Sequence, residues 1–553
     1  MIESTFSFLD YLVVFGYLAI SVGLGISLRR QSSREEFLTA GRSMGKITVG
    51  LSVMATLFSA NSFVMYPSTT YSNSLRIFMA LIAFWAVGPV VMWVFIPVYA
   101  RLNCNTAYEY LEKRFHVSVR CLASALFIML RISWMAAATY AASVGISAIS
   151  GVHQVAVTVG LGIVAIFYTM LGGLRAVMWT DVLQFFVFFG TILLAAILLV
   201  QHSDGGTSEI VNTYFEGRDN LWIDFSWDVT LQFGTWAILI GSFVEGLSAF
   251  GADQVAVQRY IAAKDEKTSQ TAMLVNLCGM AIILPGLMLI GVGLFSYFHH
   301  HPDDLTPVVI AKLKEDSQKG DAKLEGGLAA AIKAKDSDAA IAKHFRDNPR
   351  DLHKQMVRLK LNDKAMPQFV VTKFPPGIIG LLVAALMAAT MSSIDSGIHS
   401  VTTALIVDFR DRLYPHWRPE SDQKEMVVAR LLVLIIGAIS ITMALFVGQL
   451  GDVFTVAKKS VGCFAAPLLA VFVVGLFIPS SNTRGVFIGT WIGAGATLFI
   501  TYQYTKWYSM WLFPVGFVIS VTLSWVLSLA LGGARKEEEP LTYWQVMRKS
   551  SKP

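Results

Sequence analysis

The sequence predicts an all-α integral membrane protein with about thirteen transmembrane helices. Hydrophobic residues make up 54% of the 553 residues and charged residues only 15%, a balance typical of membrane proteins. Apolar runs of roughly 18 or more residues, long enough to cross a bilayer, recur about thirteen times. The net charge of +6 is dispersed along the chain, so we expect no nucleic-acid partner.

The apolar runs give the predicted spans in chain order. They lie near residues 8–28, 47–71, 75–100, 121–147, 152–172, 177–201, 228–252, 270–298, 374–407, 426–449, 453–478, 485–505 and 508–532. The first run is long enough to span and no basic segment precedes it, so we expect no cleaved signal peptide. We therefore predict one polytopic domain over residues 1–533 and a short cytoplasmic tail over 534–553.

Basic residues in the loops predict the orientation of the spans. They follow the first, third, seventh and ninth spans: Arg29, Arg30, Arg34, Arg42 and Lys46; Arg101, Lys113 and Arg114; Arg259, Lys264 and Lys267; Arg410, Arg412, Arg418 and Lys424. All these loops fall on one side, which the positive-inside rule makes cytoplasmic. We predict a plasma (inner) membrane protein with its N-terminus outside and its C-terminus in the cytoplasm.

One loop is much longer than the others. Residues 299–373 are polar and carry apolar residues at helical spacing, which predicts short amphipathic helices outside the membrane, on the external side. The sequence leaves open whether this loop is an insertion without a role in transport or a lid over an external vestibule.

The sequence carries no sign of an enzyme. No P-loop pattern is present, so ATP hydrolysis is not the energy source, and we find no nucleophile–base or metal constellation. The four cysteines have neither disulfide-framework nor metal-ligand spacing.

Five sets of motifs occur in a fixed order along the chain. They are residues 37–43 (FLTAGRS) with 50–52 (GLS), 106–115 (TAYEYLEKRF), 172–184 (GGLRAVMWTDVLQ), Gln254 with Gln258 and Arg259, and 391–393 (MSS). With this topology, the chain resembles the sodium:solute symporter family, whose members transport sugars, proline, sialic acid, iodide, vitamins and monocarboxylates. The resemblance covers roughly residues 8 to 535.

The resemblance implies a fold and a coupling ion. The fold is a five-plus-five inverted-repeat (LeuT-type) core, with repeats at about 47–201 and 228–478, one helix before the core and two after it. Na⁺ is the implied coupling ion, and no organic cofactor is implied. The implied activity is import of a small organic solute by alternating access.

A sodium site inside a membrane needs carbonyl oxygens from broken helices and hydroxyls that face inward. Ala389, Ser392 and Ser393 share one face of the ninth span because they are spaced i, i+3, i+4. The resemblance implies a Na⁺ site made of these two hydroxyls with the carbonyls of Ala389, Ala55 and Phe58. The alternative is that each hydroxyl bonds only its own helix.

Two acidic residues are candidates for a second cation site. In relatives the aspartate that corresponds to Asp181 can join hydroxyls of the serine-bearing helix, but this chain has Ala389 where such relatives often have serine. Asp395, two positions after Ser393, could compensate. The alternative role for Asp181 is a structural cap, because buried carboxylates are usually paired or ion-binding.

Residue types at the solute positions disfavour a sugar. Where sugar-carrying relatives have Glu and Ser in the third span, Asn before Gln in the seventh and Gln in the eleventh, this chain has apolar residues near Ala83, then Asp253 and Lys458. A lysine or arginine inside a span costs roughly 2.5 to 3.5 kcal/mol on insertion scales. We therefore expect Lys458, together with Arg131, to receive a carboxylate or other anion.

The alternative for these cations is pairing with Glu245, Asp253 or Asp395. Asp253 and Ser62 complete the set of candidate solute residues.

The sequence thus favours a sodium-coupled symporter. Two alternatives stay open: proton coupling through Asp181, Asp395 or His399, and a membrane sensor with a transporter fold. The expected partners are a small-molecule solute and membrane lipid, and the sequence leaves the oligomeric state open.

Overall fold

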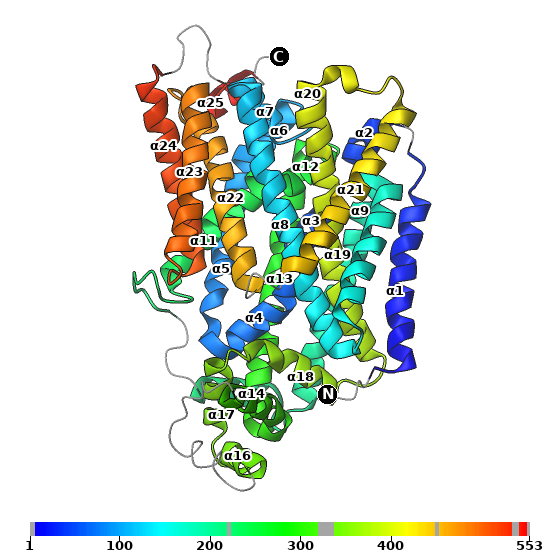
Figure 1. Ribbon diagram of the computed structural model, residues 1–553, viewed down its shortest axis with the longest axis vertical. Helices are drawn as coiled ribbons and strands as arrows, with labels where there is room; N and C mark the ends of the chain where they lie inside the picture. The colour runs from blue at the N-terminus through cyan, green and yellow to red at the C-terminus, as the bar shows by residue number, and fades with distance from the viewer. Residues whose placement is uncertain are drawn as a thin grey trace.

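The computed structural model describes residues 6–31, 33–217, 223–318, 337–447, 453–533 and 541–549, and in these residues every regular element is a helix (Figure 1). The side chains of several helical residues, Lys458 among them, lie outside the described set. Most helices run side by side along the long axis. Helices α14, α16, α17 and α18 lie beyond one end of this bundle, here called the insertion end, and α25 lies at the other, the tail end.

The thirteen predicted spans all have counterparts. Ten helices in the described residues are long and apolar enough to cross a membrane. One of them, α9, covers two predicted spans, and the broken second span and α22 supply the rest.

The spanning elements are, in order, α1 (Phe8–Ser27); α3 (Lys46–Ala55) with α4 (Ala60–Asn73); α5 (Met79–Val90), η3 (Val91–Phe95) and α6 (Ile96–Arg101); α8 (Val117–Ser150); α9 (Gln154–Gln201); α11 (Thr235–Leu247), η4 (Ser248–Ala252) and α12 (Gln254–Ala262); α13 (Glu266–His300); α19 (Ile378–Ala404) with η7 (Leu405–Arg410); α21 (Asp422–Val447); α22 (Val453–Phe477); α23 (Thr483–Gln503); and α24 (Leu512–Ala530).

Helix α9 is a hairpin that turns at Gly173. Gly173 has φ 54° and ψ −157°, a conformation open essentially to glycine alone. Gln184 Nε2 lies 3.5 Å from the hydroxyl of Tyr168, although a straight helix would separate residues sixteen apart by about 24 Å. The two halves therefore fold back on each other as the predicted fifth and sixth spans.

Two spans are interrupted in the middle. In the second span, α3 ends at Ala55 and α4 begins at Ala60. In the seventh span, Asp253 takes an extended conformation after η4 and caps α12 by accepting a hydrogen bond from Val255 N at 2.8 Å. These breaks begin the two halves of a five-plus-five inverted-repeat core, with α1 before it and α23 and α24 after it.

Helix α1 is attached to α19, far along the chain. The Asp10 carboxylate accepts hydrogen bonds from the backbone N–H groups of Gly377 at 2.8 Å and Gly380 at 2.6 Å. These are N–H groups at the start of a helix, which have no partner within it. Asp10 also accepts from Ser7 N at 2.8 Å, so the same carboxylate caps α1 itself.

The polar segment after the eighth span is helical in its described parts. It contains η5 (Pro302–Asp304), α14 (Thr306–Gln318), α16 (Ser337–Asp347), α17 (Pro349–Arg358) and α18 (Ala365–Lys373), while residues 319–336 lie outside the described residues. This insertion packs on the end of α4, where His353 Nδ1 lies 2.6 Å from the Tyr71 hydroxyl.

The tail end is joined by ion pairs between short helices and span ends. Arg120 contacts Asp408 and Glu112, each at 2.6 Å, and Arg410 contacts Glu425 at 2.5 Å. The short elements here are α2 (Arg34–Thr39), α7 (Glu109–Arg114) and α20 (Asp411–Leu413), with α25 (Tyr543–Lys549) docked beside them; α10 (Gly206–Glu216) lies at the insertion end.

Candidate functional site

The break in the second span faces the serines of α19. Ala55 is the last residue of α3, so its carbonyl has no partner within that helix. The Ser392 hydroxyl lies 3.1 Å from the Ala55 carbonyl oxygen and 2.9 Å from that of Ala389. The Ser393 hydroxyl lies 3.3 Å from the same Ala389 oxygen. Both serines bond their own helix, and Ser392 also reaches α3, so the alternative that each hydroxyl bonds only its own helix does not hold for Ser392.

A small cavity connects the five candidate sodium ligands. Ala55, Phe58, Ala389 and Ser392 line it, and Ser393 adjoins it through the Ala389 carbonyl. All five residues are buried. Because carbonyl and hydroxyl oxygens converge here, the arrangement can hold a small hard cation with no protein charge of its own.

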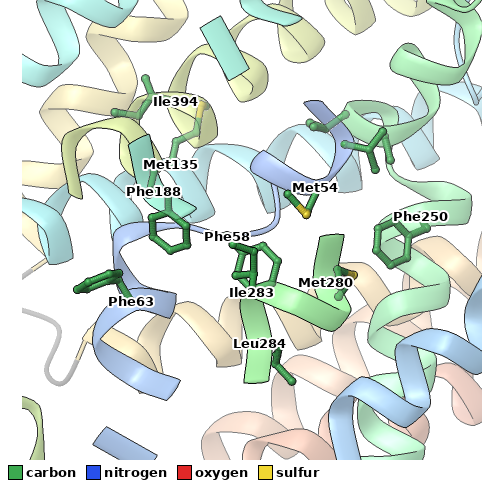
Figure 2. Close-up of a cluster of buried hydrophobic side chains, with 14 of the residues drawn as sticks. Met54, Phe58, Phe63, Met135, Phe188, Phe250, Met280, Ile283, Leu284 and Ile394 are labelled. Carbon is green, nitrogen blue, oxygen red and sulfur yellow. The ribbon is translucent and has the colours of Figure 1, made fainter. Parts of the chain in front are cut away.

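The surroundings of this cavity are apolar. Figure 2 shows Met54, Phe58, Phe63, Phe188 and Ile283 gathered around the break, and all are buried. Side chains of this kind exclude water, and the polar groups in the cavity wall are the carbonyl and hydroxyl oxygens and the Gln184 side chain, whose Oε1 has no hydrogen-bond partner among the described residues. An ion that enters would therefore exchange its hydration shell for protein oxygens.

Asp181 is held by a buried arginine. Arg259 Nη2 lies 2.9 Å from Asp181 Oδ2, and both residues are 0% exposed. Ser52 donates a hydrogen bond of 2.5 Å to the same Asp181 oxygen. Arg259 also donates to Ser52 and Ser396. Asp181 Oδ1 has no hydrogen-bond partner among the described residues.

Asp395 lies near this ion pair on α19 and is also fully buried. It accepts hydrogen bonds from the Tyr168 hydroxyl and from Ser396 N. Asp395 is linked to Arg259 through the Ser396 hydroxyl, which accepts a hydrogen bond from Arg259 and donates one of 3.2 Å to Asp395 Oδ1. If both acids, Asp181 and Asp395, are ionised, the cluster carries one uncompensated negative charge, which burial makes costly.

His399, the third candidate for proton coupling, lies one turn further along α19. Its Nε2 lies 2.9 Å from the Phe37 carbonyl oxygen, and its Nδ1 lies 3.3 Å from Gln258 Nε2. One nitrogen thus faces an acceptor and the other a donor, the pattern of a neutral imidazole. This hydrogen bonding disfavours His399 as a proton carrier.

A second, larger pocket begins at the same break and extends toward the insertion end. Its wall includes residues 56–59, Ser62, Arg131 and Asp253, so three of the four predicted solute residues lie together. Phe58 lines both this pocket and the small cavity. Phe233, Tyr508 and Ser509, from connections between spans, also belong to its wall.

The two predicted solute cations are Lys458 and Arg131. The side chain of Lys458 lies outside the described residues. Arg131 pairs with Asp253 through Nε–Oδ1 and Nη2–Oδ2 contacts of 3.1 and 2.5 Å. The pairing alternative therefore holds for Arg131, although the pair itself lines the pocket. Glu245 lines the pocket as well.

Sequence reasoning missed the role of Arg259. We counted it among the cytoplasmic loop cations, but the structure buries it completely between Asp181, Ser52 and Ser396. An available signal was its place in a largely apolar helix, because a buried arginine requires a carboxylate.

Comparison with known proteins decides the family. The sequence model of the sodium:solute symporter family matches residues 37–318 and 342–493 of this chain. The chain belongs to the sodium:solute symporter family. Members of this family are transporters, so the symporter is a multi-pass membrane protein that couples movement of a small-molecule solute to Na⁺, and it is not an enzyme.

Individual relatives match over most of the symporter. It is 28% identical over 501 residues to the sodium/sialic acid symporter of Proteus mirabilis (strain HI4320), covering 90% of each chain. It is 27% identical over 513 residues to the human sodium-coupled monocarboxylate transporter 1, covering 90% of this chain and 75% of the relative.

A solved structure matches the fold of the symporter. It is described as a substrate-bound outward-open state of a Na⁺-coupled sialic acid symporter that reveals a novel Na⁺ site. The TM-score is 0.80 with 26% identity, and the match covers 96% of this chain and 99% of that one. The match agrees with the inverted-repeat core described above.

Proposed function

We propose that this symporter imports a small carboxylate, with Na⁺ bound at the break in the second span. The observation that carries the proposal is the contact of Ser392 with the Ala55 carbonyl at the C-terminal end of α3. This contact brings together ligands from two helices that are far apart in the sequence. The proposed Na⁺ ligands are the carbonyls of Ala55, Phe58 and Ala389 and the hydroxyls of Ser392 and Ser393.

The solute is proposed to lie in the larger pocket, on the other side of the same break. The start of α4 faces this pocket, and a helix N-terminus attracts anions through its free N–H groups and its dipole. Ser59 and Ser62 line the pocket there, and Arg131 with Asp253 lies in the same pocket wall. Lys458 remains a candidate for a further positive charge. The names of the sialic acid and monocarboxylate relatives support an anionic solute.

The binding of Na⁺ and the binding of the solute are coupled because their two cavities share part of one wall. Phe58 lines both cavities, so a Na⁺ in the smaller one places a positive charge beside the solute pocket, where the Glu245 carboxylate otherwise repels an anion. Sodium would therefore raise the affinity for the anion, and by linkage the anion would raise the affinity for sodium equally.

The buried acidic cluster supports a second cation. Asp181 and Asp395 exceed Arg259 by one charge, and Asp181 Oδ1 is unpartnered among the described residues. We propose that this cluster takes up Na⁺ or a proton during transport. Proton coupling remains the alternative to a second Na⁺ at this place.

The membrane orientation is also a proposal. The short helices α2, α7 and α20 belong to the loops whose basic residues predicted the orientation, and they lie at the tail end (Figure 1), which supports a cytoplasmic tail end in the plasma (inner) membrane. The insertion of about 299–373 would then be external, where its contact with α4 through Tyr71 supports a lid.

The sodium site is tested by thermal stability of the purified protein in NaCl and in choline chloride at equal ionic strength. Ligand that binds only the folded state stabilises it by about 2.7 kcal/mol at one hundred times its dissociation constant. We expect a sodium-specific rise in the wild type. We expect Ser392→Ala/Ser393→Ala to weaken sodium binding at least tenfold, because two of five oxygens are lost.

The control is Thr390→Val in the same helix. The Thr390 hydroxyl bonds only its own helix, at 2.7 Å from the Leu386 carbonyl, so this variant should keep the sodium shift. Equal sodium shifts in the wild type and the double serine variant would contradict the site. No shift in any of them would favour proton coupling, and uptake measured against pH would then decide.

A further inference from the structure

Trp134 carries an unused hydrogen-bond donor in the wall of the solute pocket. It lies on α8, and its ring lines the pocket that begins at the break in the second span. The indole Nε1 is buried and has no hydrogen-bond acceptor among the described residues. A buried donor without an acceptor is unfavourable, so this N–H is suited to an oxygen that arrives with the solute.

The neighbouring cation does not replace this donor. Arg131 is three residues before Trp134, so the two side chains share one face of α8. Its guanidinium is held by both oxygens of Asp253, at 3.1 and 2.5 Å. The positive charge on this wall is therefore balanced by Asp253, and the Trp134 N–H beside it is a buried donor without an acceptor among the described residues.

The pocket has a second unengaged group, on the side of the broken helix. Ser59 is 0% exposed and lines the same pocket, and its hydroxyl has no partner among the described residues. A carboxylate has two oxygens that accept hydrogen bonds. Neutral donors can bind it without the cost of bringing an unpaired protein cation into the membrane.

Most of the remaining wall surface is apolar, although Tyr66, Ser242, Glu245 and Ser248 also line it. Its large side chains include Met65, Ile77, Phe84, Leu130 and Met280. Hydroxyl groups on the body of a solute would lose their hydrogen bonds to water against such a surface. The body of a favourable solute is therefore apolar.

We propose that the Trp134 N–H donates to a carboxylate oxygen of the solute, and that the pocket selects monocarboxylates with an apolar body over polyhydroxylated acids. Trp134 is in this view a specificity-determining residue. The inference rests on the proposed function, because it assumes an anionic solute in this pocket.

The test is binding to the purified protein in saturating NaCl, measured by calorimetry and thermal shift. The probes are phenylacetate and isovalerate, which have apolar bodies, and N-acetylneuraminate, which is polyhydroxylated. Trp134→Phe keeps an aromatic ring but removes the N–H together with part of the indole, and the control variant removes the same atoms outside the pocket. Trp85→Phe is the matched control, because Trp85 is 41% exposed and does not line the pocket.

We expect the wild type to bind phenylacetate or isovalerate more tightly than N-acetylneuraminate. We expect Trp134→Phe to bind the apolar acids about tenfold more weakly, as for loss of one hydrogen bond to a charged group, with the shift from sodium alone unchanged. Trp85→Phe should bind like the wild type.

The outcomes separate the two proposals. If the wild type binds a carboxylate and Trp134→Phe binds it equally well, the role of Trp134 is wrong while the proposed function stands. If N-acetylneuraminate binds more tightly than the apolar acids, the apolar selectivity is wrong. If sodium binds but none of the three acids does, the anionic solute is wrong, and the inference fails with it.

Discussion

At the residue scale, Asp181 and Arg259 form an ion pair that is completely buried. Both side chains are fully buried, and Ser52 and Ser396 complete the hydrogen bonding of the guanidinium. An ion pair in such a place is not evidence of large stability by itself, because desolvation offsets the attraction. Its consequence is that neither partner can be removed alone without leaving a buried charge.

Replacement of Asp181 by Asn is predicted to destabilise the protein strongly. We expect a loss of about 3 to 5 kcal/mol, because Asp181 is the carboxylate in direct contact with Arg259, and its removal leaves the buried guanidinium without a contacting anion. The melting temperature of the purified protein measures this loss. Asp351→Asn is the control, because Asp351 is partly exposed on the insertion, where ion pairs contribute little. Equal melting temperatures for Asp181→Asn and the wild type would contradict the ion pair.

The same residues show how far the sequence determines the site. The spacing of Ala389, Ser392 and Ser393 places them on one helix face, and this could be deduced from helical periodicity alone. The partner of Asp181 could not, because Ser52, Arg259 and Ser396 come from three different spans. Only tertiary packing decides which of several distant polar residues meets a buried carboxylate.

At the scale of elements, the hairpin in α9 depends on a single glycine. Gly173 has positive φ, and a Cβ there would lie 2.9 Å from the Phe37 carbonyl oxygen and from a ring carbon of the same residue. The turn also brings Gln31 to the Gly172 carbonyl. A side chain at Gly173 would therefore strain the turn and push away the segment that carries Phe37.

Replacement of Gly173 by Ala is predicted to cost about 1 to 3 kcal/mol, the range for a residue forced into a sparsely populated backbone conformation. Gly160→Ala is a matched control on the same helix, because nothing lies within 4 Å of its added Cβ. Melting temperatures of both variants test this prediction. A control that melts as low as Gly173→Ala would mean that the loss is not specific to the turn.

Hydropathy located the elements better than their internal breaks. All thirteen predicted spans have counterparts because an apolar run of membrane length leaves the backbone no other way to satisfy its hydrogen bonds. The interruptions at residues 56–59 and at Asp253 produce no comparable signal in the hydropathy of the sequence. Thr, Leu, Phe and Ser at the first break are compatible with a helix, and tertiary contacts override that preference.

At the scale of the whole molecule, the number of coupled cations sets the electrical behaviour. One Na⁺ with a monovalent anion moves no net charge. A second cation at the cluster of Asp181 and Asp395 would add one positive charge per cycle, and each charge gains about 2.3 kcal/mol from 100 mV.

We therefore predict electrogenic uptake of a monovalent anion in proteoliposomes, faster when the interior is negative. Asp395→Asn should remove this dependence on voltage while sodium still stimulates uptake through Ser392 and Ser393. Uptake by the wild type that is indifferent to voltage would argue for a single Na⁺ and against the second cation.

The contact between Asp10 and α19 also bears on how the protein is made. The carboxylate enters the membrane with α1, yet its partners at Gly377 and Gly380 follow 367 and 370 residues later. At ordinary rates of translation this interval is about 20 to 70 seconds. During that time the Ser7 groups that bond Asp10 are its available ligands. The first span is thus synthesised well before the contact that joins it to α19 can form.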